Sequence, residues 1–268
     1  MRNDITYRLQ DYTHLNWAEG MRPSTTSGTF LKAKSGSGNR LMYYKLSNYD
    51  SVRGIFGHEC INELIASRLL DALGFPHVHY RLIHARVLID GVEHETWLNS
   101  SRSFRPSGTQ KMRFDVFYDL YKQPGESPFG FCERFGWAEF VHQMILTDYL
   151  LINRDRHGAN VEMIQTKDGL YRPAPLFDNG LSLVFSTYGD DVRIAKFNPL
   201  EDVPCNNYFG YKSVERNLEF LPKGFAKGAL DRLHKDALLA GLDNVISPIH
   251  RDKIWEIISQ RWSHYESL

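Results

Sequence analysis

Three oxygen-bearing side chains stand close together in the stretch from Asn153 to Leu181. Asp155 is followed five residues later by Asn160, and Asp178 comes after an intervening polar segment. Transfer of a phosphoryl group needs positioning and charge stabilisation rather than covalent help from the protein. Magnesium prefers oxygen ligands, so one amide and one carboxylate suffice to hold it. These residues predict phosphoryl transfer from a magnesium nucleotide.

The surrounding pattern indicates how these side chains are positioned. An apolar helical run, Trp137 to Ile152, leads to the stretch, and a polar hairpin then separates Asn160 from an apolar strand ending at Asp178. We expect Asp155 to face the nucleophile, and Asn160 and Asp178 to bind the metal. This is the spacing of the catalytic and metal-binding loops of protein kinases.

The match becomes specific when the motif is read residue by residue. The runs are Asn-Arg-Asp-Arg-His-Gly-Ala-Asn, residues 153–160, and Ala-Pro-Leu-Phe-Asp, residues 174–178. They resemble the active-site signature of the HipA-like serine/threonine kinases, whose fold is related to those of protein kinases and phosphoinositide kinases. The competing interpretation is a polar hairpin in an unrelated α/β domain, since Asp and Asn favour loops for local reasons.

The resemblance implies a two-lobed α+β protein-kinase-like fold, with a β-rich small lobe over residues 1–104 and a mainly helical large lobe over 105–268. It implies ATP and Mg²⁺ as cofactors, and transfer of the γ-phosphate to a Ser or Thr hydroxyl of a protein substrate. His157 is expected at the nucleotide site, where it would hold the loop between Asp155 and Asn160 in place. The chain has neither the His-Arg-Asp order nor the Ala-Pro-Glu segment of ordinary eukaryotic kinases.

A run of small hydroxyl residues, Ser24 to Thr29, leaves backbone N–H groups open to phosphate oxygens. The family carries its phosphate loop in a Gly-x-x-x-Lys context, which Gly28 and Lys32 match. We therefore expect residues 24–32 to form the phosphate loop, with Ser27, Gly28, Thr29 and Lys32 at the nucleotide. The Gly-Ser-Gly turn at 36–38 is interpreted instead as a hairpin tip. As a hypothesis, the hydroxyl run is also a site of autophosphorylation.

Lys45 lies within the apolar strand Leu-Met-Tyr-Tyr-Lys-Leu-Ser. A buried ammonium is costly without anionic partners, which nucleotide phosphates and a helix glutamate would supply. The helical pattern over residues 57–73 places Glu59 and Glu63 one turn apart. The family's Asn-Glu pattern favours Glu63 as the partner, with Glu59 in reserve and expected to be solvated.

Two strands joined by Asp90-Gly91 are predicted over residues 77–104. The end of this hairpin, near 97–104, is expected to read the adenine edge through backbone groups. His77 and His79 alternate and so share a strand face. Without a third ligand in the sequence, they are interpreted as a satisfied surface pair rather than a metal site.

The second half of the chain is predicted to be mainly helical. An amphipathic stretch covers residues 114–121, and a strongly apolar helix is expected over 133–151. A strand-like run follows at 181–185, and two terminal helices are expected at 227–240 and 248–265.

Composition limits the remaining possibilities. The 268 residues have a formal net charge of zero, which argues against direct nucleic-acid binding. The three cysteines form no Cys-x-x-Cys pair, and no apolar run has the length of a membrane span. The N-terminus is not a signal peptide. These features predict a soluble, cytoplasmic protein, although secretion without a cleaved signal is compatible with them.

Partners and rival functions stay open at the level of sequence. The best-known member of the family is longer and works with a DNA-binding antitoxin. For this shorter chain, a stand-alone kinase is as plausible as a toxin that pairs with an antitoxin. The first rival is a lipid or small-molecule kinase of the same fold, and the second a nucleotide-binding pseudokinase acting as a binding module. A metal-dependent phosphodiesterase could use Asp155, His157 and Asp178, but it would give Lys45 no role.

Overall fold

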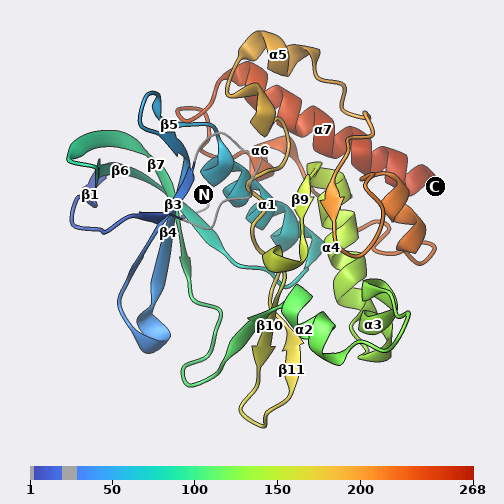
Figure 1. Cartoon of the computed structure of the whole chain (residues 1–268). Coiled ribbons are helices and arrows are strands. Elements are labelled where there is room, and N and C mark those ends of the chain that lie inside the picture. Colours follow the sequence, from blue (N-terminus) through green and yellow to red (C-terminus); the bar gives the residue numbers. More distant parts are fainter. Residues whose placement is uncertain (1–2, 20–28) are drawn as a thin grey trace.

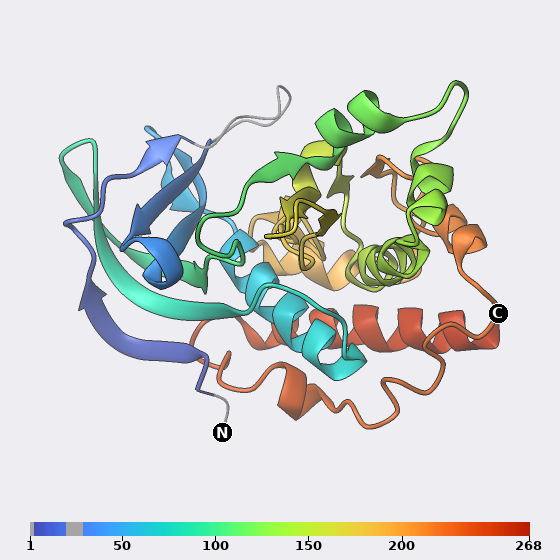
Figure 2. The same ribbon diagram turned by 90° about the horizontal axis from the view of Figure 1, so that it is seen from below.

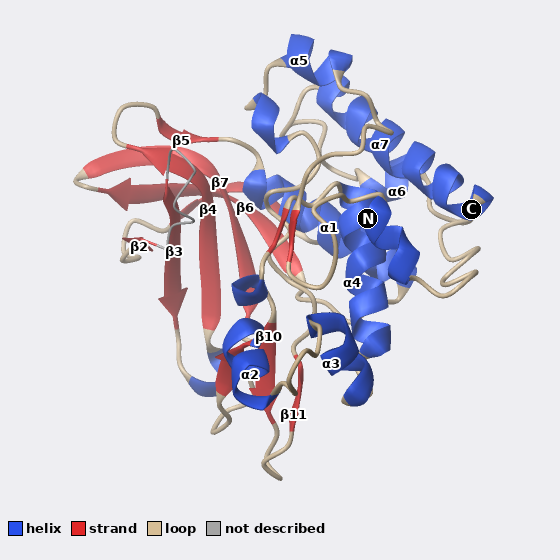
Figure 3. Ribbon diagram, turned by 45° about the vertical axis from the view of Figure 1, so that its right-hand side comes forward, coloured by secondary structure: helices blue, strands red, loops and turns tan. Residues whose placement is uncertain are grey.

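The computed structural model of the chain describes residues 3–19 and 29–268. A twisted seven-stranded sheet forms one side of the molecule and most helices form the other (Figures 1 and 3). The strand order is β1-β6-β7-β4-β3-β2, with β5 paired to β4, and only the β1–β6 pair is parallel. The strands are β1 (Ile5–Asp11), β2 (Ala18–Glu19), β3 (Thr29–Ser35), β4 (Met42–Asp50), β5 (Gly54–Phe56), β6 (Tyr80–Ile89) and β7 (Val92–Arg102).

The hairpin predicted around Asp90-Gly91 is confirmed as β6 and β7. Both turn residues have positive φ, 51° and 81°, as a two-residue type I′ turn requires. Pairing is continuous from Ile89 opposite Val92 to Tyr80 opposite Ser101. The far end of β7 therefore reaches the junction with the helical side of the molecule.

The helices are α1 (Glu59–Leu73), α2 (Phe114–Tyr121), α3 (Pro128–Arg134), α4 (Ala138–Leu151), α5 (Asp191–Lys196), α6 (Lys235–Leu238) and α7 (Pro248–Ser267). Short 3₁₀ segments cover Gly38–Arg40, Gly158–Asn160, Phe185–Thr187 and Arg216–Phe220. Two small sheets complete the fold: β11 (Tyr171–Pro173), β10 (Glu162–Gln165) and β8 (Lys111–Arg113) form one, and β12 (Asn206–Asn207) with β9 (Asp155–Arg156) forms the other. Among the described residues, no helix combines the length and the apolar character that crossing a bilayer requires.

Helix α1 lies between the sheet and the helical side (Figures 1 and 2). Its side chains are buried over almost every position, and its apolar residues join one large core with those of α4 and α7. A smaller apolar cluster, including Leu46 and Leu98, fills the sheet region. Helix α1 belongs to the first 104 residues, yet it shares a core with the helical side of the molecule. The expected boundary between two lobes at residue 104 therefore stays a prediction.

The single helix expected over 133–151 is two helices. Helix α3 ends at Arg134, and Gly136 with φ of 74° turns the chain before α4 begins. Aromatic residues here pack on one another, with Phe135 and Trp137 stacked at 4.7 Å between ring centroids. Their near-helical spacing in the sequence reflects this cluster rather than a continuous helix.

Two further expectations are wrong. Residues 181–185 are not a strand, because Leu183 has φ of 56° and the segment instead bonds its backbone to the end of α4, Leu183 N to Leu151 O at 2.6 Å. The helix expected over 227–240 reduces to α6. Ala226 and Gly228 have positive φ, so the chain before α6 is a series of turns. The helix predicted over 248–265 is confirmed as α7.

Gly74 ends α1 with φ of 72°, and a Cβ atom at this position would meet no atom within 4 Å. Replacing Gly74 by Ala therefore isolates the cost of left-handed backbone, which we expect to lower the free energy of unfolding by about 1 kcal/mol. Gly74→Asn is the matched control, since Asn tolerates this conformation better. Urea unfolding measures both, and equal losses in the two variants would contradict the explanation.

Candidate active site

The loop that was expected to be catalytic, residues 153–160 and called the catalytic loop below, begins where α4 stops. Ile152 adopts left-handed φ of 54° and Asn153 N donates to Asp148 O at 2.9 Å, which turns the chain out of the helix. The loop then forms β9, whose Asp155 lies opposite Asn206 of β12 in a parallel pair. Asp155 is thus fixed by backbone pairing to a segment fifty residues further along the chain.

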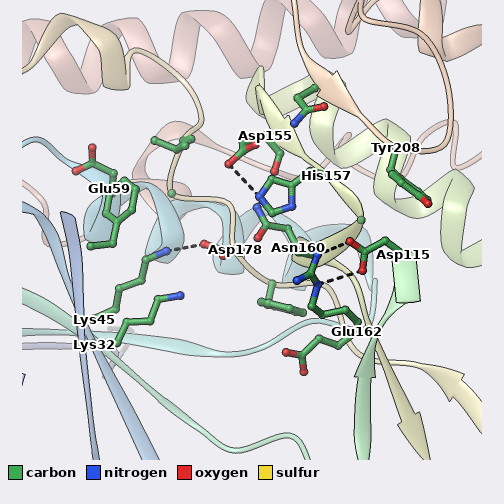
Figure 4. A pocket seen from close by; sticks show the side chains of 18 residues that line it. Lys32, Lys45, Glu59, Asp115, Asp155, His157, Asn160, Glu162, Asp178 and Tyr208 are labelled. Carbon is green, nitrogen blue, oxygen red and sulfur yellow. Dashed lines mark hydrogen bonds and ion pairs between the residues drawn. The ribbon is translucent and has the colours of Figure 1, made fainter. Parts of the chain in front are cut away.

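The five-residue spacing between Asp155 and Asn160 closes a compact loop. Asn160 N donates to His157 O at 2.8 Å, and its side-chain Nδ2 donates to the Asp155 carbonyl at 2.8 Å. Since the amide nitrogen is engaged in this way, the amide oxygen is the atom that remains for a metal. The loop presents the side chains of Asp155, His157 and Asn160 to the same cleft (Figure 4).

Arg156 lies inside the motif, yet the sequence analysis assigned it no role. Its side chain is 1% exposed and its guanidinium bonds Asp148 of α4, with the closest contact at 2.8 Å. The same guanidinium donates to the Phe177 carbonyl at 2.8 Å and to Asn179 Oδ1 at 2.6 Å. One buried cation therefore joins α4, the catalytic loop and the segment that carries Asp178.

The expected ion pair between Lys45 and Glu63 is present, with 3.1 Å between Nζ and Oε1. Lys45 Nζ also lies 2.5 Å from Asp178 Oδ1, which the sequence did not predict. Glu63 Oε2 accepts from Asn179 N at 2.9 Å. Asn62, the neighbour of Glu63, donates to the carbonyls of two residues that follow Asp178. Helix α1 thereby holds Lys45 and the segment that carries Asp178, which is the expected metal-binding loop.

Charges in the site shift several pKa values. Burial acts to raise the pKa of Asp178, but the ammonium groups of Lys45 and then Lys32 outweigh it and hold that pKa below its ordinary value. Burial acts to lower the pKa of Lys45, and the carboxylates of Asp178 and Glu63 reverse this and raise it well above the ordinary value. Both groups are consequently ionised at neutral pH, as metal and phosphate binding require.

Asp155 has a different environment. Burial raises its pKa, His157 opposes the shift, and the charge of Asp178 adds to it. His157 Nε2 lies 3.6 Å from the Asp155 carboxylate (Figure 4). A carboxylate with raised pKa is a better proton acceptor than an ordinary one, which suits a general base.

Glu59 is not the solvated carboxylate that was expected. It is 1% exposed, in the first turn of α1, and its Oε2 accepts from Asn48 N at 3.3 Å. Its Oε1 is buried with no hydrogen-bond partner among the described residues. Burial raises its pKa. The spacing from Glu63 correctly placed both residues on one side of the helix, but it could not indicate burial.

A cleft of about 580 Å³ collects these groups (Figure 4). It is lined by Lys32, Lys45 and Glu59 on one side, by His157, Asn160, Asp178 and Asp155 with its strand partner Asn206 in the middle, and by Arg113, Asp115, Glu162 and Tyr208 on the other. The last group was missed, because Arg113, Asp115 and Tyr208 come from segments that carry no motif in the sequence.

A smaller hollow of about 210 Å³ adjoins the cleft and shares Lys32, Lys45 and Asp178 with it. Its walls include Ser101, Arg102 and Phe104, from the end of the β6–β7 hairpin that was expected to read adenine, and the Phe104 ring packs on Phe177 at 5.5 Å. The aromatic residues in its otherwise polar lining, Tyr43, Tyr44, Tyr80, Phe104 and Phe177, suit a flat heteroaromatic base.

The expected phosphate loop is only partly visible. Ser27 and Gly28 lie outside the described residues, and Thr29 opens β3. Lys32 follows on β3, directly opposite Lys45 of β4, and both line the cleft. Lys34 is exposed like Lys32, but it does not line the cleft.

The residues present fit a magnesium nucleotide. Asp178 and Asn160 offer the carboxylate and amide oxygens that magnesium takes, and the cleft holds a buried carboxylate oxygen of Glu59 that has no partner among the described residues. Two lysines beside these acids offer the opposite charge that phosphates require.

Comparison with known proteins supports the fold. No protein-family model matches the chain, and no curated protein matches it. The chain is similar to the crystal structure of a Helicobacter pylori proinflammatory kinase, CtkA, with a TM-score of 0.60 and 18% identity over 96% of this chain and 97% of that chain. Shewanella oneidensis HipA, solved with HipB and operator DNA, matches with a TM-score of 0.48 and 15% identity over 94% of this chain and 66% of that chain. The expected α+β kinase-like fold is thereby confirmed by the CtkA match.

The Asp148–Arg156 pair generates a stability prediction. Asp148→Asn removes the charge partner and leaves the guanidinium buried, which we expect to cost about 3–5 kcal/mol in the free energy of unfolding. Asp119→Asn is the control, because Asp119 pairs with Lys122 on the exposed surface and should leave the urea midpoint nearly unchanged. A loss in Asp148→Asn no larger than that of the control would contradict the role given to Arg156.

Proposed function

We propose that this protein is an ATP-dependent kinase that transfers the γ-phosphate to a Ser or Thr hydroxyl of a protein, possessing the chemistry of the HipA-like kinases. The observation that carries the proposal is the convergence of Lys45, Asp155, Asn160 and Asp178 on one cleft. These residues come from the sheet, the catalytic loop and the segment after β11. A polar hairpin in an unrelated domain would require no such convergence.

Each residue has a defined task in this proposal. Asp178 and Asn160 would hold Mg²⁺, which when bound neutralises charge on the phosphates. Lys45, held by Glu63, would face the phosphates together with Lys32. The expected phosphate-loop residues Ser27, Gly28 and Thr29 would contribute to the same contact. His157 would hold the catalytic loop in place at the nucleotide. The base would occupy the hollow beside Phe104.

Asp155 would accept a hydrogen bond from the acceptor hydroxyl and orient it toward the phosphate. An Asn206 side-chain hydrogen bond helps hold the Asp155 carboxylate in place, and β12 fixes it through the backbone. Partial burial raises the pKa of Asp155, so its carboxylate accepts a proton from a hydroxyl better than a fully solvated Asp would.

The outer part of the cleft supports a protein acceptor. Beyond Asp155 it is lined by a paired Arg113 and Asp115 and by the Tyr208 ring. These side chains offer both charges and an aromatic surface to a peptide segment. An antitoxin-type partner and a cytoplasmic location stay predictions.

The decisive assay uses ATP labelled in its γ-phosphate, with magnesium, the chain itself and a generic protein substrate. Asp155→Asn keeps the shape of the side chain and removes its basicity, so we expect label transfer to fall by about 10²–10⁴-fold. Asp168→Asn, in the exposed β10–β11 turn, is the control and should transfer label like the native chain.

Mass spectrometry of the labelled chain tests autophosphorylation within residues 24–29, and no phosphate there would remove that hypothesis.

Transfer that persists in Asp155→Asn would contradict the role of the carboxylate. Label absent from every protein, with ATP still raising the melting temperature, would favour a lipid or small-molecule acceptor or a binding module.

The environment of Asp155 predicts a pH dependence. The base works only when deprotonated, and its pKa is raised from the ordinary value of 3.8. kcat/KM should therefore fall as the pH decreases through that raised pKa. His157 opposes the shift, so His157→Gln should move this acid limb to still higher pH. An acid limb that is unmoved or lost in His157→Gln would contradict the assignment to Asp155.

A further inference from the structure

A second cluster of metal-ligand side chains lies outside the cleft. Asp71 stands in the last turn of α1, and the chain reverses after Gly74 so that His77 and His79 return beside it. One ligand atom from each of the three residues lies within 4.8 Å of the others, the only such group of three among the residues the structure describes. None of the three lines the candidate active site.

The sequence analysis interpreted the two histidines as a surface pair because no third ligand was visible. The structure corrects this, since the His77 side chain is only 3% exposed and Asp71 Oδ1 faces both rings. Asp71 precedes the histidines by only a few residues, but it belongs to a helix whereas they lie in extended chain. Only the turn at Gly74 brings the three together.

The distances suit a tetrahedral ion. Zinc bonds to nitrogen and oxygen at about 2.0–2.2 Å, so two ligands of a tetrahedral site stand roughly 3.3–3.6 Å apart. Asp71 Oδ1 lies 3.6 Å from His77 Nε2 and 3.5 Å from His79 Nδ1. These two separations are long for hydrogen bonds and match edges of a zinc tetrahedron, and the two imidazole nitrogens lie within 4.8 Å of each other.

The His77 ring is already oriented as a ligand. Its Nδ1 lies 2.8 Å from the Phe75 carbonyl, which can only accept, so Nδ1 carries the proton and Nε2 keeps the lone pair that a metal ligand needs. A backbone carbonyl on the far nitrogen is the usual support of a zinc-bound histidine. Ser67 Oγ, 3.1 Å from Nε2, is the hydrogen-bond partner that an ion would replace.

Charge and access favour a cation as well. A carboxylate in the last turn of a helix meets the negative end of the helix dipole, and a bound cation offsets that repulsion. His79 and Asp71 have side chains 74% and 37% exposed, so an ion can enter from solvent, while the buried His77 anchors the inner side.

We propose that Asp71, His77 and His79 bind one Zn²⁺ ion, with water as the fourth ligand. The ion joins the end of α1 to the segment that enters β6. His77 forms a backbone bridge with Leu176, two residues before Asp178. Zinc at this position therefore braces α1 against the chain that leads into the metal-binding loop of the cleft. The site does not depend on the proposed kinase activity.

Titration calorimetry with ZnCl₂ on the tag-free chain tests the site, together with visible absorption of the Co²⁺-loaded protein as a report of tetrahedral geometry. We expect one tight site per chain and a rise in melting temperature on zinc addition. His79→Ala and Asp71→Asn, both partly exposed and so tolerable to the fold, should each weaken zinc binding at least about tenfold.

The matched control is His84→Ala. His84 Nε2 pairs with Glu95 at 2.9 Å, but this pair belongs to no group of three ligands among the described residues. The control should bind zinc like the native chain, as should Asp155→Asn, which separates this site from the cleft. Native affinity in His79→Ala and Asp71→Asn, or the absence of a tight site in the native chain, would overturn the proposal.

Discussion

The buried guanidinium of Arg156 is the constraint around which the candidate site is arranged. A charged group that is 1% exposed is tolerable only when it is paired and hydrogen-bonded, and here Asp148, Phe177 and Asn179 give each guanidinium nitrogen an acceptor. These acceptors belong to the end of α4 and to the segment that carries Asp178. The catalytic loop and the metal-binding loop consequently share one anchor, and neither can shift without exposing an unpaired charge in the core.

A second constraint involves Lys45, which lies on strand β4 of the large sheet. Asp178 and Glu63 share the single ammonium of Lys45, so this triad retains an excess negative charge beside the Asn160 amide. Glu59 adds a buried carboxylate to the same cleft. Such a surplus is unfavourable in isolation and becomes favourable when a divalent cation is added. This charge distribution is the one that the proposed binding of a magnesium nucleotide would relieve.

Where sequence patterns failed, a non-local interaction had replaced a local preference. The apolar spacing over 227–240 is typical of a helix, but positive φ at Ala226 and Gly228 accompanies turns that pack on the core. The run at 181–185 has the composition of a strand, yet its backbone bonds the end of α4. Arg156 is part of the sequence motif, but its role became evident only from the residues that surround it in the fold.

Features that depend on interactions between nearby residues could be predicted from the sequence. It determined α1 with its glycine stop, the β6–β7 hairpin through Asp90-Gly91, and the Asp155–Asn160 loop, because period, turn chemistry and loop closure act over a few residues. The tertiary structure alone decided that Lys45 meets Asp178, that Glu59 is buried, and that Asp71 faces His77 and His79. Those outcomes depend on which surfaces pack together and exclude water, and that is a property of the whole chain rather than of any window in it.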